Sequence, residues 1–328
     1  MSSSQLKMRA IVKGALTWLP GFRRLANRHT GGTVEARYCY SVWMRHLRIV
    51  AGSQGTRVPN CVAELGPGDS LGIGLAAMLS GADRYFSLDR KAFANPQTNL
   101  AILEGLFELF RARAPIPDDS EFPGVFPKLH SYAFPSDILD EAHLARCLEP
   151  HRVGAIRRAT AGEPSPSSTG EPVEIRYLAP WNERRTILPE SVDWIFSQAV
   201  LEHVDDVSGA YAALMKWLRA GGVMSHSIDY CCHGLTRDWN GHWTIADWVW
   251  SVVRGRRTYL INRLPHSAHV KAMRECGFRI VSDVRSRGPI LPRSELASRF
   301  REISDEDLGT SGAFVVAVKP PLPSPDKR

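Results

Sequence analysis

The feature that most constrains this chain is a regular alternation of strand-like and helix-like segments after residue 60. Short apolar runs typical of strands lie at 61–65, 84–89, 173–180, 192–200 and 223–230. Segments with helical spacing separate them, at 70–79, 95–113, 136–160 and 209–222. Strands that alternate with helices form parallel sheets covered on both faces. The sequence therefore predicts an α/β fold with a doubly wound, mostly parallel sheet.

The chain divides into three parts. We expect a helical N-terminal extension over residues 1–60, the α/β domain over 61–320 and a disordered tail over 321–328. A further helix at 269–278 and strands at 279–286 and 312–320 complete the domain. Two inserts interrupt it. Residues 114–172 are rich in Pro and Asp, with a flexible stretch at 161–172, and residues 231–268 form a tryptophan-rich insert.

The composition is that of a soluble protein. The residues are 44% hydrophobic and 23% charged, and no apolar run approaches the roughly 18 residues of a membrane helix. The N-terminus lacks the long apolar stretch and cleavage site of a signal peptide. Six cysteines form no CxxC pair and no zinc spacing, which favours reduced thiols and a cytoplasmic protein.

The chain carries a net charge of +7, with small basic clusters scattered along it. Such clusters can attract nucleic acid or anionic lipid, but scattered ones are typical of a solvated surface. Residues 6–25 have the apolar and basic mixture of a helix that contacts a membrane surface weakly, although packing on the domain is the commoner fate of such a segment.

The first strand leads into a glycine-rich loop, "AELGPGDSLG", where Gly66, Gly68 and Gly72 permit a tight turn and close approach of a ligand. Glu64 and Asp69 would repel a pyrophosphate at this loop and favour a cationic ligand. S-adenosylmethionine carries a sulfonium and an ammonium and fits that charge. Asp89 ends the second strand 21 residues after Gly68, where a carboxylate can bind ribose hydroxyls.

Together with four later motifs, this loop resembles the class I S-adenosylmethionine-dependent methyltransferases. The motifs are "FSLD", "VDWIFSQAVLEHVDD", "LRAGGVMSHSIDY" and the pair "GFRIV" and "FVVAVK". The resemblance runs from about Val62 to Lys319 and is closest to the branch with "LEHV" after the fourth strand. It departs at Ser70, where many members have a third glycine. The family implies a Rossmann-like methyltransferase fold with an antiparallel last strand.

The resemblance also implies the cofactor-binding residues. The glycine-rich loop would line the methionine part, Asp89 the ribose, and Ala179 the adenine, whose amino group would need a backbone partner or Asn182. The residues at the end of the fourth strand would floor the site. The full predicted set is Glu64, Gly66, Gly68, Asp69, Asp89, Ala179, Gln198 and Ala199.

Methyl transfer to a hydroxyl needs a base, and a histidine or carboxylate at a strand end can supply it. His203 follows the fourth strand and is either a base or wall residue, or a histidine bonded to backbone at a helix start. His226 and Asp229 lie on opposite faces of a regular strand, and Asp229 is nearer its end. We predict Asp229 as the base, with His233 as the alternative; Asp229 could instead cap a turn.

Two further sets of residues were considered. His226, Asp229, His233 and His242 could form a metal cluster, but magnesium prefers oxygen ligands and the spacing matches no defined site, so we predict no metal. In the 231–268 insert, Trp239, Trp243 and Trp250 follow helical spacing, which predicts either a helix core or a lid over the acceptor. As a lid, it would contact substrate through Trp239, His242, Trp243 and Arg257.

The sequence therefore predicts an S-adenosylmethionine-dependent methyltransferase acting on a hydroxyl of a small molecule or saccharide. RNA methylation is an alternative that rests on positive charge alone, since the sequence has no NPPY-like motif and no separate RNA-binding module. A binding protein that keeps the fold without turnover is the other alternative.

Overall fold

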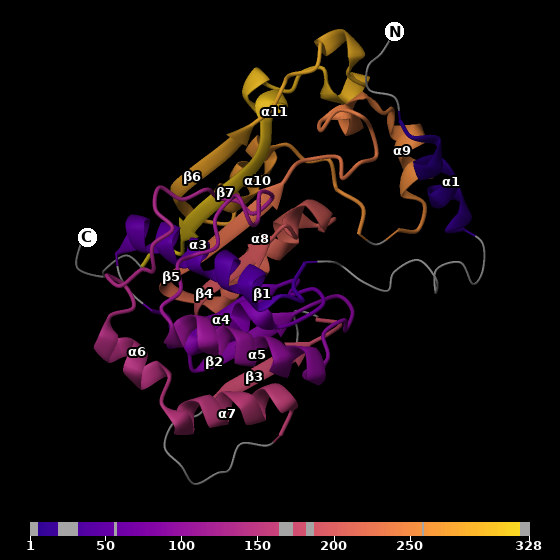
Figure 1. The fold of residues 1–328 in the computed structure, drawn as a ribbon. Coiled ribbons are helices and arrows are strands. Elements are labelled where there is room, and N and C mark those ends of the chain that lie inside the picture. The colour runs from indigo at the N-terminus through magenta and orange to yellow at the C-terminus, as the bar shows by residue number, and fades with distance from the viewer. Residues whose placement is uncertain are drawn as a thin grey trace, which may run out of the picture.

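A computed structural model describes residues 6–18, 32–55, 58–163, 173–181, 187–257 and 259–321. Their centre is a single seven-stranded sheet, crossed by helices on both faces (Figure 1). Its strands are β1 (Cys61–Leu65), β2 (Arg84–Leu88), β3 (Glu174–Leu178), β4 (Val192–Gln198), β5 (Leu218–Asp229), β6 (Arg279–Arg287) and β7 (Thr310–Val318).

The strand order is β3-β2-β1-β4-β5-β7-β6. Strands β1 to β5 pair in parallel, and β7 inserts antiparallel between β5 and β6. The chain therefore reverses direction on either side of β1, which brings the carboxyl ends of β1 and β4 together at a crevice. This is the predicted Rossmann-like methyltransferase fold, with the expected antiparallel last strand.

Helices cover both faces of this sheet. One face carries the helices before β3, and the other carries α8 and α10, as the composition of the two main core clusters shows. The helices are α3 (Ala36–Gln54), α4 (Gly72–Leu79), α5 (Pro96–Arg111), α6 (Glu141–Cys147), α7 (Pro150–Ala161), α8 (Val207–Trp217), α10 (His266–Glu275) and α11 (Asp305–Gly309). Because both faces are covered, all five residues of β1 are buried, and four of them are apolar, with Glu64 as the exception.

Helix α3 belongs to the domain core although it precedes the first strand. Trp43 is fully buried and packs on Trp194 and Phe196 of β4. Arg45 is also fully buried and donates to the carbonyls of Pro117 and Pro127 at 3.2 and 2.7 Å. The arginine therefore ties the irregular segment 114–140 to the sheet.

The N-terminal helix α1 (Met8–Leu16) packs on α9 (Asp247–Arg254) at one flank of the molecule (Figure 1). A Cβ at Gly14 would collide with the backbone carbonyls of Val252 and Val253, so the glycine lets the two helices touch. Met8, Val12 and other apolar side chains of this pair remain exposed. No helix in the described ranges is both long and apolar enough to cross a membrane.

Three predicted elements differ from the structure. Helix α8 ends at Trp217 rather than at Gly221 and Gly222, because Leu218 already pairs with Val192 in the sheet. The predicted helix at 136–160 is two helices, α6 and α7, since Pro150 starts a new helix. In the tryptophan-rich insert, Trp239 and Trp243 precede α9 and do not share a helix with Trp250. Asn182, residues 164–172 and most of the predicted tail lie outside the described residues.

Candidate active site

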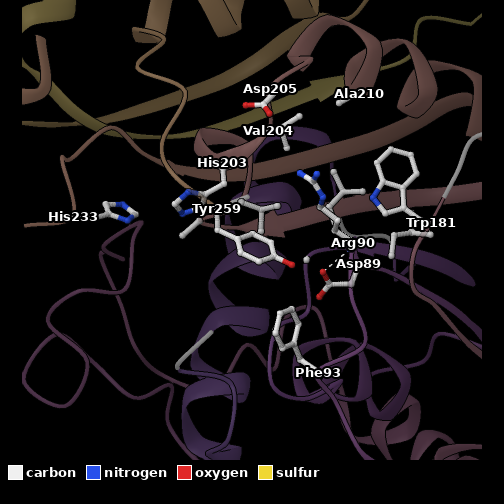
Figure 2. Close-up of a pocket in the computed structure, with 16 residues that line it drawn as sticks. Asp89, Arg90, Phe93, Trp181, His203, Val204, Asp205, Ala210, His233 and Tyr259 are labelled. Atoms are coloured by element: carbon white, nitrogen blue, oxygen red, sulfur yellow. Dashed lines mark hydrogen bonds between the residues drawn. The ribbon is translucent and has the colours of Figure 1, made fainter. Parts of the chain in front are cut away.

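A pocket of about 640 Å³ opens at the carboxyl ends of β1, β2 and β4 (Figure 2). This volume suits a cofactor-sized ligand. It is bounded by the loop after β1, the segments after β2 and β3, the turn after β4 and part of the 231–268 insert. The lining residues that matter below are Gly66, Gly68, Asp89, Trp181, His203 and Tyr259.

The glycine-rich loop forms one wall. Gly66 and Gly68 both have positive φ, at 63° and 75°, a conformation that favours glycine. A Cβ on Gly66 would lie 2.7 and 2.9 Å from the two methyl carbons of Val200. The loop thus brings bare backbone to the pocket, and a side chain at Gly66 would be excluded by both its conformation and its neighbour.

Glu64 does not line the pocket. Its side chain is buried on the face of the sheet that α4 covers, and it accepts a hydrogen bond from the hydroxyl of Tyr85. Burial raises the pKa of Glu64 to about 8, although the Tyr85 and Gly74 donors oppose the shift. The prediction that Glu64 contributes charge to the loop is corrected, because a buried carboxyl with this pKa is largely neutral at pH 7.

Asp89 does reach the pocket and, with Asp205, supplies the carboxylates of its lining. Its Oδ1 accepts from the backbone N–H groups of Arg90 at 2.6 Å and Lys91 at 3.4 Å. Burial raises the pKa of Asp89, and the nearby charge of Asp69 adds to this, while the backbone donors oppose it. Asp69 itself is buried and does not line the pocket.

The end of β3 meets the end of β2 beside Asp89. The N–H of Trp181 donates to the carbonyl of Asp89 at 2.9 Å, and the N–H of Asp89 donates to Leu178 at 3.0 Å. The Trp181 ring therefore lines the pocket next to Asp89 (Figure 2). The predicted adenine neighbour Ala179 lies just behind it and does not line the pocket.

The end of β4 contributes one of its two predicted residues. Ala199 lines the pocket and has a φ of 53°, so its backbone turns sharply there. The amide of Gln198 instead lies 3.4 Å from a ring nitrogen of His46 and donates to the carbonyl of Phe126, also at 3.4 Å. Gln198 therefore faces α3 and the 114–140 segment.

His203 and His233 lie together at the other end of the pocket, 5.1 Å apart between ring centroids. Burial lowers the pKa of His203 to about 4, and His233 contributes to the shift. The His203 imidazole is therefore neutral near pH 7, and burial disfavours its protonated form. In Figure 2, Tyr259 lies between His203 and Asp89, which joins the two ends of the pocket.

Asp229, the predicted base, lies one step behind the pocket. Its Oδ2 is 3.2 Å from Nε2 of His233, and its Oδ1 accepts from the N–H of Cys231 at 2.8 Å. Burial raises the pKa of Asp229, but the hydrogen bonds from His233 and Cys231 outweigh it and leave the pKa below its ordinary value. Asp229 is thus an anion that both caps a turn and orients His233.

Sequence reasoning missed Glu202. Its side chain is 2% exposed, and neither carboxylate oxygen has a hydrogen-bond partner of ordinary geometry. Burial places its pKa well above the ordinary value, with the nearby charge of Asp229 adding to the shift and backbone N–H groups opposing it. One atom each of Glu202, His203 and His233 lies within 4.8 Å of the others. The "LEH" motif was the available signal, but the sequence does not reveal that His233 joins it.

The metal cluster considered from the sequence does not assemble. His226 is fully buried, and its Nδ1 lies 2.8 Å from the hydroxyl of Ser197. His242 is 1% exposed and packs on the Trp243 ring. Of that set, Asp229 and His233 pair with each other. Within the described ranges, the ligand-capable side chains that do converge are those of Glu202, His203 and His233.

The predicted substrate residues of the insert do not line the pocket. Trp243 is fully buried and donates to the carbonyl of Arg263 at 3.1 Å, next to buried His242. Trp239 donates to the carbonyl of Pro289 at 3.0 Å. Arg257 donates to the carbonyl of Ala10 at 3.1 Å and so ties α1 to the insert. The insert reaches the pocket through His233 and Tyr259.

No family model matches this sequence, and no curated protein matches it either. Solved structures with a similar fold include an S-adenosylmethionine-dependent methyltransferase from Mesorhizobium loti, at 15% identity over 88% of this chain and 100% of that one, with a TM-score of 0.41. Another is phosphoethanolamine N-methyltransferase 2 of Haemonchus contortus in complex with S-adenosylmethionine, at 15% identity over 85% of this chain and 53% of that one, with a TM-score of 0.42. A third is the [4+2]-cyclase SpnF, at 12% identity over 85% of this chain and 81% of that one, with a TM-score of 0.41. These values are too low to bear on what this chain binds or catalyses.

Proposed function

We propose that this protein is an S-adenosylmethionine-dependent methyltransferase. The observation that carries the proposal is the conjunction of the strand order, with β7 antiparallel beside β5, and a pocket at whose edge Gly66, Gly68 and Asp89 lie together. The strand order is that of the class I methyltransferases the sequence resembles, and ligands of such sheets bind at the carboxyl ends of the strands.

The lining residues fit the proposed cofactor. The loop at Gly66 and Gly68 leaves no room for a side chain and offers backbone to the methionine part. Asp89 offers a carboxylate to the ribose hydroxyls, and Trp181 beside it offers an aromatic wall for the adenine. When bound, S-adenosylmethionine supplies a methyl group activated by a sulfonium.

His203 and His233 are the groups we propose at the acceptor. An acceptor hydroxyl that took up this methyl group would lose its proton, and that proton would need a base. His233 can accept this proton, because the Asp229 carboxylate paired with it stabilises the positive charge that would form, and neutral His203 lines the pocket wall beside it. Asp229 therefore acts through His233 rather than as the base itself.

A small hydroxylated acceptor, such as a metabolite or saccharide unit, suits this pocket better than RNA. The histidine end is bounded by Tyr259 and by Asp205, an acid that pairs with Arg254. Asp89 and Asp205 both line the pocket, and two carboxylates in the lining disfavour a phosphate backbone.

We also propose a cytoplasmic location on the basis of the six free cysteines, and a weak membrane contact through the exposed apolar side chains of α1.

Calorimetric titration with S-adenosylhomocysteine and, separately, with NAD⁺ tests the cofactor. We expect one equivalent of S-adenosylhomocysteine to bind and NAD⁺ not to bind; the reverse result, or binding of neither, would overturn the proposal. If the cofactor binds, incubation with methyl-labelled S-adenosylmethionine and panels of hydroxylated small molecules separates an enzyme from a binding protein without turnover.

A further inference from the structure

The buried carboxyl of Glu202 has no paired cation and no hydrogen bond of ordinary geometry among the described residues. A carboxylate removed from water without a hydrogen bond or a cation is strongly destabilising, so it either keeps a proton or takes up a cation. Both oxygens of Glu202 are unpartnered, and so is Nδ1 of His203 beside it, which is also buried. These atoms of Glu202 and His203 thus lie in adjacent, buried side chains without hydrogen-bond partners of ordinary geometry in the described part of the chain.

His233 completes this group from a different part of the chain. One atom of His233 lies within 4.8 Å of ligand-capable atoms of both Glu202 and His203. Asp229 lies 3.2 Å from Nε2 of His233, which fixes the ring and leaves Nδ1 to bind. Histidines that bind metals commonly donate their other ring N–H to a carboxylate in this way.

Other buried histidines do not offer the same arrangement. His226, His242 and His269 each leave one ring nitrogen unpartnered. In the part of the chain that the structure describes, however, none of them gathers two further ligand-capable side chains. The unpartnered atoms at Glu202 are therefore distinguished by their convergence and not by burial alone.

We propose that Glu202, His203 and His233 bind a divalent first-row transition metal ion, with Zn²⁺ as the representative case. Two imidazoles and one carboxylate suit such ions and do not suit Mg²⁺, which prefers oxygen ligands. Three protein ligands leave coordination positions open, and His203 and His233 line the pocket, so those positions face the acceptor. Metal binding does not depend on the proposed methyl transfer, but a role in binding and polarising the acceptor oxygen does rest on it. In that role the bound metal would take the place of the two histidines in promoting loss of the acceptor's proton, because ring nitrogens that bind a metal are not free to take up a proton.

Cobalt titration of the chelator-treated full chain tests the site, because Co²⁺ bound to nitrogen and oxygen ligands absorbs visibly and competes with Zn²⁺. We expect one equivalent to bind. Glu202→Gln, which removes the anion at constant size, is expected to weaken binding by at least about 100-fold, and Asp229→Asn by about 10- to 100-fold through the orientation of His233. His130→Gln, which removes an exposed imidazole elsewhere, serves as the matched control and is expected to bind as the wild type does.

Three results would each overturn the metal site. They are the absence of stoichiometric binding, an unchanged affinity in Glu202→Gln, and an intense near-ultraviolet thiolate band that points to Cys231 as a ligand. Thermal unfolding shows whether each variant is folded, and we expect metal-free Glu202→Gln to be at least as stable as the wild type, since it loses a buried unpaired carboxyl. S-adenosylhomocysteine titrated into the same metal-free samples keeps the two proposals apart. Cofactor binding without metal binding rejects only this site, and the opposite result rejects only the proposed function.

Discussion

The two ends of the pocket are built in different ways. At the cofactor end, Gly66, Gly68 and Asp89 directly follow two neighbouring parallel strands that are close in the sequence, and positive φ angles at the glycines set the loop. At the acceptor end, His203 follows β4 whereas His233 and Tyr259 come from the long insert after β5. The first end is specified locally, and the second depends on how distant segments pack. Substitutions at the cofactor end are therefore expected to change cofactor affinity, and those at the acceptor end to change the rate of methyl transfer.

The sharpest way to break the cofactor end is Gly66→Ala. The new Cβ would meet the Val200 methyl carbons at 2.7 and 2.9 Å and would need a positive φ. We expect affinity for S-adenosylhomocysteine to fall by about 100-fold, or about 2.7 kcal/mol. Gly124→Ala is the matched control, because nothing lies within 4 Å of its Cβ. Wild-type affinity in Gly66→Ala would show that the loop does not contact the cofactor.

Asp89→Ala tests the only predicted acid that lines the pocket. Loss of charge-assisted hydrogen bonds to the ribose is expected to weaken S-adenosylhomocysteine binding by about 10- to 100-fold in calorimetry. Asp137→Ala removes a carboxylate that pairs with Arg48 at the surface and serves as the control. Equal affinity of the two variants would contradict the placement of the ribose.

Glu64, buried beneath the cofactor end, is expected to make the free energy of unfolding depend on pH. Its pKa is about 8 in the folded chain against an ordinary 4.5, so between pH 5 and 7 the folded state keeps a proton that the unfolded state has lost. The free energy of unfolding should therefore fall as pH rises, by about 2 kcal/mol over this range from Glu64. Urea unfolding of the wild type and Glu64→Gln measures the difference. A pH dependence that is the same in both would remove Glu64 as its source.

Asp229→Asn changes the acceptor end by removing the charge that pairs with His233. The amide cannot stabilise positive charge on His233, so we expect methyl transfer to an identified acceptor to slow by about tenfold. Affinity for S-adenosylhomocysteine is expected to stay within about threefold, since Asp229 does not line the pocket. Single-turnover rates and calorimetry together check this. A parallel loss of cofactor affinity would show that the two ends are not separable.

The smallest effect is expected for Trp239→Phe. The indole donates to the carbonyl of Pro289 at 3.0 Å and does not line the pocket. The variant should lose about 1 kcal/mol of stability with unchanged cofactor affinity. Thermal unfolding and calorimetry measure both quantities, and weaker cofactor binding would return Trp239 to the role of a lid residue.

Much of the fold could be predicted because its signals are local. The apolar runs of β1 and β4 and the helical spacing of α5 report burial within a few residues. The predicted strands match the observed ones closely except for β5, which begins at Leu218 rather than at 223. Helix ends were less predictable: α8 ends before its glycines because Leu218 pairs with Val192, a contact that no local pattern records. Helix α3 was assigned to an extension because burial against β4 is likewise not local.

The sequence by itself determined the glycine-rich turn, the acid that follows β2 and the alternation that makes a doubly wound sheet, because backbone conformation and periodic burial are properties of neighbouring residues. Only the tertiary structure decided which of the acids and histidines meet. It turns Glu64 away from the pocket toward Tyr85 and brings His233 to Glu202 and His203. Side-chain direction and long-range packing depend on the whole chain, so charge and spacing alone could not assign them.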